Sequence, residues 1–148
     1  MLYKFLIVLH LLGSSVWIGG HIVLVLVVLP KAMRERDPIR VRDFERGFAR
    51  VGLPALALQV FTGLWLTTYW GIDWRTVFST PTPAAHLALA KLVLLAAVVV
   101  IGAHAERRVL PRLSAETMGF FAAHAWAVTV LSLLMLIAGA GIRTGGLF

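Results

Sequence analysis

The sequence predicts an all-α fold, an integral membrane four-helix bundle, and three observations lead to that prediction. Hydrophobic residues make up 59% of the chain and charged residues only 14%, whereas soluble domains carry roughly 25% charged residues. The apolar residues are gathered in runs that reach the length of about 20 residues that a membrane-spanning helix needs. The charged residues are gathered between those runs. With 148 residues, the chain is expected to form a single domain.

Four segments meet the length and hydropathy of a membrane span. They run from 5 to 29, from 51 to 72, from 84 to 105 and from 118 to 142. The first segment is longer than the core of a signal peptide and lacks a small-residue cleavage site, so we expect it to be retained. The two halves of the chain show no clear internal repeat.

The positive charge is distributed unevenly between the predicted loops. The formal net charge of +7 would suit nucleic acid, but membrane topology explains the clustering of the cations better. The predicted loop from Pro30 to Arg50 and the loop after the third span are rich in Lys and Arg, whereas the loop from Asp73 to Pro83 holds only Arg75. By the positive-inside bias, the two basic loops are cytoplasmic and both termini lie outside. We therefore predict a multi-pass protein of the bacterial inner membrane, with no nucleic-acid partner.

The most informative residues are the histidines, because all of them fall inside predicted spans. They are His10, His21, His86, His104 and His124. Ionisable side chains cost energy in hydrocarbon, so they usually face the bundle interior and serve a function. The chain has no cysteine, which removes iron–sulfur clusters and thioether-attached haem.

Helical geometry places these histidines in same-face pairs. His10 and His21, eleven positions apart, project from one face with about 16 Å of rise between them. His86 and His104, eighteen positions apart, return to one face of the third span. This spacing suits b-type haems gripped by histidines from different helices. The expected outer pair is His10 with His86, and the inner pair is open between His21 with His104, His21 with His124, and His104 with His124.

Two further residues belong to the predicted cofactor site. Lys91 lies well inside the third span, where it would pair with a haem propionate or transfer a proton, unless it snorkels to the interface. Trp17 lies on the same stripe of the first helix as His10 and His21.

Three stretches of the sequence resemble the copper-resistance protein D (CopD) family. The string H-L-L-G-S-S-V-W-I-G-G at 10–20 is similar to that family's first helix, and F-A-R-V-G-L-P-A-L-A-L at 48–58 to its second. The strings A-K-L-V-L-L at 90–95 and E-R-R-V-L-P at 106–111 are similar to its third. The resemblance implies four membrane helices and copper transport or resistance. Soft Cu(I) sites favour Met and Cys, and here cysteine is absent and the methionines form no paired motif.

The same positions resemble the HemJ-type protoporphyrinogen oxidases. That family has a first-helix histidine followed seven residues later by tryptophan, matched by His10 and Trp17. It also has a third-helix lysine, matched by Lys91, and a histidine near the end of that helix, matched by His104. The resemblance implies haem binding at His10 and redox work on a porphyrinogen. The remaining histidines depart from this pattern and are similar to those of di-haem membrane cytochromes b.

The function predicted from the sequence is that of a membrane b-type cytochrome with one or two haems, two being favoured by the histidine spacing. Filling both axial positions with histidine favours electron transfer, across the membrane or to a quinone or another small redox partner. The alternatives are a haem-dependent oxidoreductase of the HemJ type, a CopD-like copper transporter, and a non-catalytic membrane subunit. The catalytic residues, the electron donor and acceptor, and the oligomeric state, a homo-oligomer included, stay open.

Overall fold

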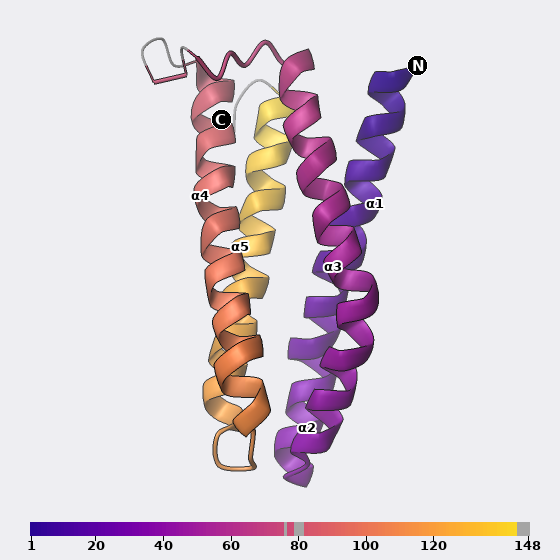
Figure 1. The fold of residues 1–148 in the computed structure, drawn as a ribbon, viewed down its shortest axis with the longest axis vertical. Coiled ribbons are helices and arrows are strands. Elements are labelled where there is room, and N and C mark those ends of the chain that lie inside the picture. The colour runs from indigo at the N-terminus through magenta and orange to yellow at the C-terminus, as the bar shows by residue number, and fades with distance from the viewer. Residues whose placement is uncertain (76, 79–81, 145–148) are drawn as a thin grey trace.

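The computed structural model describes residues 1–75, 77–78 and 82–144 (Figure 1). The elements in chain order are α1 (Leu2–Val23), η1 (Leu24–Val28), α2 (Leu29–Glu35), α3 (Pro38–Tyr69), α4 (Pro83–His104), η2 (Ala105–Val109), η3 (Leu110–Arg112) and α5 (Met118–Thr144). Four helical segments are long and apolar enough to cross a membrane: Leu2–Glu35, Pro38–Tyr69, Pro83–Arg112 and Met118–Ile142. The all-α membrane fold predicted from the sequence is thereby confirmed.

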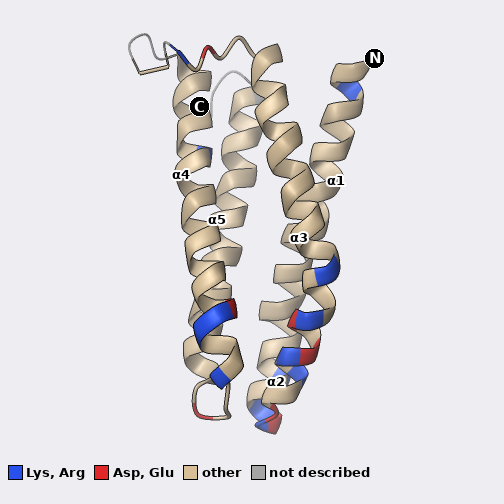
Figure 2. Ribbon diagram, in the orientation of Figure 1, with Lys and Arg blue, Asp and Glu red and all other residues tan. Residues whose placement is uncertain are grey.

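The helices form two antiparallel hairpins. The first helix packs along α3, α4 packs along α5, and the hairpins meet along α1 and α5. The start of α1, the end of α3, the start of α4 and the end of α5 lie at one end of the molecule, which we call the terminal end (Figure 1). The turns inside the hairpins lie at the other end, where most of the Lys, Arg, Asp and Glu residues gather (Figure 2). We call this the basic end.

The first hairpin contains far more helix than the sequence predicted. The prediction of a loop from Pro30 to Arg50 is wrong, because the first helix continues through α2 to Glu35 and α3 begins at Pro38. Hydropathy marks where a helix leaves the hydrocarbon and not where it ends, and arginine is a good helix former. The arginines of this region therefore lie on helical extensions that protrude beyond the apolar part of the bundle.

A two-residue turn joins α2 to α3. Arg36 adopts a left-handed conformation with φ of 54°, which ends the helix. The carboxylate of Asp37 then accepts hydrogen bonds from the backbone N–H groups of Ile39 and Arg40, as an N-cap residue does. Pro38 occupies the first helical turn, where its missing N–H costs nothing.

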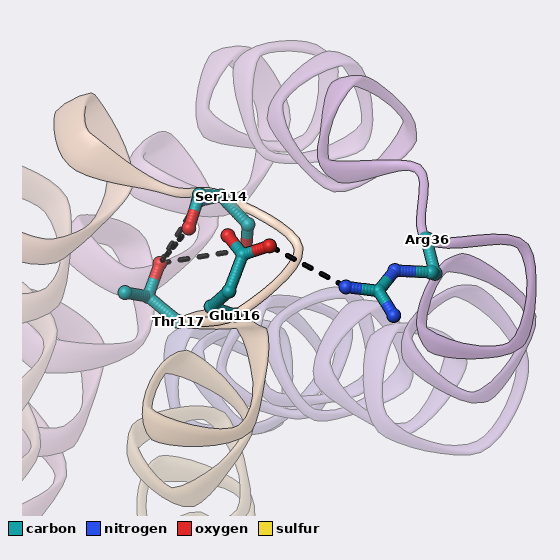
Figure 3. A network of polar contacts seen from close by, with 4 residues as sticks. All are labelled: Arg36, Ser114, Glu116 and Thr117. Atoms are coloured by element: carbon teal, nitrogen blue, oxygen red, sulfur yellow. Dashed lines mark hydrogen bonds and ion pairs between the residues drawn. The ribbon is translucent and has the colours of Figure 1, made fainter.

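A contact between charged side chains links the two hairpin turns at the basic end. Arg36 donates to the carboxylate of Glu116 at 3.4 Å, and Ser114 and Thr117 lie beside it (Figure 3). Hydrogen bonding from Ser114 is the main cause that lowers the pKa of Glu116. Both charged side chains are exposed, so the contact positions the turns and contributes little stability.

In each hairpin, the first helix contains a π-helical turn shortly before a proline. Segment η1 precedes Pro30, and η2 precedes Pro111. Proline lacks an N–H and clashes with the carbonyl four residues earlier, and a π turn shifts the hydrogen-bond ladder so that the helix can continue past it. Both prolines follow Val-Leu and precede a basic residue. The two hairpins thus share a local pattern that is too short to be recognised as a repeat in the sequence.

The core is tightest toward the basic end. Leu24, Leu29, Val41 and Met118 are almost completely buried there. A second cluster is built around Trp17, Val98 and Val128. The outward surface carries large apolar side chains from all four long helices, as expected for a surface that faces lipid. Between the second cluster and the terminal end, the side chains leave a cavity unfilled.

Candidate functional site: a cavity between the two hairpins

The cavity has a volume of about 480 Å³ and is lined by α1, α3, α4 and α5. Such a volume lies within the range of roughly 300–1,000 Å³ in which small molecules and cofactors bind. Leucine, isoleucine and valine make up much of its wall. The polar groups on the wall belong to His10, Ser14, Trp17, Gln59, Thr67, Trp70, Trp74, Lys91 and Ser132. A mostly apolar site with a few convergent polar groups is the usual form of a ligand-binding site.

Contacts with α3 fix the orientation of the His10 ring. Its Nδ1 lies 2.8 Å from the carbonyl oxygen of Gln59 and 3.1 Å from Oγ1 of Thr62. The Thr62 hydroxyl donates its own proton to the Leu58 carbonyl at 2.7 Å. Both partners therefore accept from His10, so Nδ1 carries a proton, and in the neutral ring Nε2 keeps its lone pair. This is the arrangement in which a histidine is prepared to bind a metal through Nε2.

Two glycines make room for the two ionisable residues of the cavity. A Cβ atom at Gly63 would lie 2.9 Å from Cε1 of His10, and a Cβ atom at Gly139 would lie 3.0 Å from Nζ of Lys91. Carbon atoms in good contact are about 3.5–4.0 Å apart. His10 and Lys91 thus each lie directly against the backbone of the partner helix in their own hairpin.

Hydrogen bonds between helices hold the wall beside His10. Ser14 Oγ lies 2.8 Å from Oε1 of Gln59, which ties α1 to α3. Trp17 donates from Nε1 to Oγ of Ser132 at 3.1 Å, which ties α1 to α5. Trp17, which the sequence predicted as part of a cofactor site, lines the cavity itself. These hydrogen bonds between polar groups in an apolar bundle are costly to break, because the freed groups would lack replacement hydrogen bonds.

Indole side chains lie at the terminal end of the cavity. Trp74 donates from Nε1 to Oγ1 of Thr67 at 3.0 Å, and Trp70 donates from Nε1 to the Tyr3 hydroxyl at 3.4 Å. Both tryptophans line the cavity. Their mixed character suits the level at which a membrane interface meets water.

His21 and His86 lie apart from the cavity wall. His21 is buried, donates from Nδ1 to the Trp17 carbonyl at 2.9 Å, and packs against the rings of Trp17 and Phe48. His86 is exposed on the first turn of α4. The structure therefore does not bring His86 to the cavity that His10 lines, although the sequence predicted those two as one pair.

His104 and His124 lie next to each other toward the basic end. Nδ1 of His104 is 3.0 Å from Nε2 of His124, and their rings stack. Of the three inner pairings that the sequence left open, His104 with His124 is therefore the one in direct contact. Neither residue lines the cavity. Within the part of the chain that the structure describes, no group of three or more His, Asp or Glu residues is placed to hold a metal ion.

The contribution of α5 to the cavity was not predicted from the sequence. Ser132, Met135 and Gly139 all line it. They stand at positions i, i+3 and i+7 of one helix, the spacing of residues that share a face. The spacing of these residues is visible in the sequence, but none of them is ionisable, and ionisable residues were the basis of the site prediction.

The fold and the cavity define a multi-pass membrane protein with a ligand-sized cavity between two helical hairpins. Comparison with protein-family models matches residues 42–142 to copper resistance protein D, CopD. The match covers more than half of the chain, and the chain therefore belongs to the CopD family, as the sequence resemblance indicated. No curated protein and no solved structure was found to match.

Proposed function

We propose that this CopD-family chain is a membrane haem protein, in which one haem b occupies the cavity and His10 is its axial ligand. The orientation of His10 carries the proposal. Its Nδ1–H is committed to Gln59 and Thr62, so the nitrogen left to bind iron is Nε2. Hydrogen bonding at the second ring nitrogen is the usual way in which proteins orient a metal-binding histidine and raise its basicity.

The rest of the cavity wall fits the same group. Apolar side chains suit the face of a macrocycle, and the Lys91 ammonium group offers the cation that a propionate needs in a medium of low dielectric constant. Gly63 and Gly139 keep the space beside both residues open. When bound, the haem would supply the redox chemistry, while the chain supplies the ligand, the charge partner and an apolar environment.

The cavity supports one haem and not the two that the histidine spacing suggested. His10 is the one histidine among the described residues that line it. A second imidazole ligand at the same iron is therefore not available from this wall, and the iron would keep a position open for a small molecule or a weaker ligand. This favours an oxidoreductase over a simple electron carrier, because a haem whose axial positions are both filled by protein ligands has no open position for a substrate.

The charge of the basic end supports an orientation in the membrane, and the depth of the cavity then supports a class of redox partner. The basic end would face the cytoplasm by the positive-inside bias, so the cavity would lie in the outer half of a bacterial inner membrane. An apolar quinone or another small lipid-soluble redox partner would reach it at that depth. Both termini would then lie on the extracytoplasmic side.

The absorption spectrum of the detergent-purified protein tests this proposal. We expect a Soret band and, by pyridine haemochrome analysis, about one haem per chain. His10→Ala should lose the band, whereas His86→Ala, which alters an exposed histidine away from the cavity, should keep it. A protein that stays colourless after haem is supplied, or a His10→Ala variant with an unchanged spectrum, would refute the proposal.

Copper is the second candidate, favoured by the family match. His10 and Met135 both line the cavity, and imidazole and thioether are ligands that suit Cu(I). Lys91 argues against it, because its ammonium group would repel a cation held in the same apolar space. Metal analysis of the purified protein separates the two candidates, since bound copper that is lost in both His10→Ala and Met135→Leu would favour transport.

A further inference from the structure

The stacked histidines at the basic end form a second constellation, separate from the cavity. His104 is the last residue of α4, and His124 lies in the second turn of α5. Their ring centroids are 5.1 Å apart with an angle of 20° between the planes, and Phe120 packs edge-on against His124. Neither ring takes part in the contacts that position His10.

The hydrogen bonds around the pair define where its protons lie. His124 Nδ1 is 3.0 Å from the backbone carbonyl oxygen of Phe120. A carbonyl can only accept, so Nδ1 of His124 is protonated and its Nε2 has a free lone pair. The 3.0 Å contact between the rings must then be donated by Nδ1–H of His104. His124 accepts at Nε2 and is therefore neutral in this arrangement, which is the state in which histidine binds metals.

The distance between the two facing nitrogens is close to the distance that a shared metal ion requires. Metal–nitrogen bonds of about 2.0–2.1 Å at a tetrahedral angle separate the two nitrogens by about 3.3–3.4 Å. The observed separation between His104 Nδ1 and His124 Nε2 is 3.0 Å. A shift of a few tenths of an ångström would admit an ion, with the His104 proton moving from Nδ1 to Nε2. The Phe120 contact would stay intact and hold the His124 ring in place.

The location of the pair leaves room for further ligands. His104 is exposed and His124 is half-buried, so the ion would be open on one side. The charged residues Glu106, Arg107 and Arg108 begin two positions after His104 and are exposed, which places the pair where the bundle leaves the apolar layer. Water is therefore available to complete the coordination that two protein ligands leave open.

We infer that His104 and His124 form a binding site for one divalent transition-metal ion. Imidazole ligands suit copper, zinc and nickel, and the general order of affinity puts Cu²⁺ above Ni²⁺ and Zn²⁺. With two protein ligands and exchangeable water, the site is one for exchange of the ion and not for permanent structural binding. The inference does not rest on haem in the cavity, because the two sites share no described residue.

Titration of the tag-free, detergent-purified protein with Cu²⁺ and, in parallel, with Zn²⁺ tests this inference. We expect one Cu²⁺ per chain, with an electron paramagnetic resonance spectrum that shows coupling to imidazole nitrogens. His124→Ala should weaken binding by about tenfold or more, equivalent to about 1.4 kcal/mol. His104→Gln should do the same, although the glutamine amide can still donate to His124 and keep the local packing.

His86→Ala provides the matched control, because it removes an exposed histidine from the same helix without touching the pair. Thermal unfolding of each variant shows whether the fold is kept, and His104→Gln is the variant expected to keep it. Copper affinity in His104→Gln equal to that of the unaltered protein would overturn the inference. So would an equal loss in His86→Ala, since that would indicate nonspecific binding to surface histidines.

Discussion

Gly63→Ala should weaken haem binding because of the space that the new methyl group would take from His10. The added Cβ would lie 2.9 Å from Cε1 of the His10 ring, whereas carbon atoms in contact prefer about 3.5–4.0 Å. The ring must therefore move by about 0.6–1.1 Å. A shift of that size disrupts the bonds of Nδ1 to Gln59 and Thr62, now 2.8 and 3.1 Å long.

The size of the effect follows from those two hydrogen bonds. Each contributes about 0.5–1.5 kcal/mol net, so together their loss costs about 1–3 kcal/mol. If the orientation of His10 prepares it for iron, that cost appears in the haem affinity as a loss of about 5- to 150-fold. The thermal stability of the haem-free protein should fall for the same reason, because the bonds join α1 to α3 before haem binds.

The assay is titration of the haem-free protein with haem, followed by the Soret band. Gly19→Ala provides the control, because a Cβ at Gly19 on the same helix as His10 meets nothing within 4 Å. Alanine in a helix is favoured over glycine by about 1 kcal/mol, so this control should be neutral or slightly stabilising. If haem binds equally well to Gly63→Ala and to Gly19→Ala, the role assigned to the His10 ring orientation is wrong.

Three further predictions concern other parts of the bundle. Lys91→His should place a second imidazole on the cavity wall and convert a high-spin haem spectrum to a low-spin one, while an unchanged spectrum would mean that residue 91 does not reach the iron. Gly20→Ala should lower thermal stability by about 1–3 kcal/mol through overpacking, since its Cβ would lie 2.0 Å from the Phe48 ring, and the neighbouring Gly19→Ala should not. A reporter fused after the last residue should behave as extracytoplasmic, and cytoplasmic activity of that fusion would reverse the proposed orientation.

The membrane fold could be predicted because hydropathy and charge report directly on solvent. Residues 84–105 and 118–142 were expected as spans, and the corresponding helices run over Pro83–Arg112 and Met118–Ile142. The first hairpin turn at Arg36 and Asp37 could not be found in this way. The one signal for it in the sequence is the capping aspartate before Pro38, which is a weak pattern inside a charged stretch.

The site could be predicted only in part, because periodicity gives the face of one helix and not its partner. His10 and Lys91 were both selected for being ionisable inside a span, and both line the cavity. The pairing of His10 with His86 assumed that similar depth implies proximity. It left out the hairpin arrangement, in which α1 packs along α3 and the bonding partners of His10 are Gln59 and Thr62. Those two residues are uncharged and were not selected.

The matching prolines of the two hairpins have a consequence for the cavity. His10 stands twenty residues before Pro30, and Lys91 stands twenty residues before Pro111. The two residues therefore occupy equivalent places in two similar halves, each against a glycine of its own hairpin. A cavity between two identical halves would bind a flat ligand in either of two orientations. Here an imidazole lies on one wall and an ammonium group on the other, so the two orientations are no longer equivalent. A ligand that carries a metal ion or an anionic group would therefore bind in a single orientation.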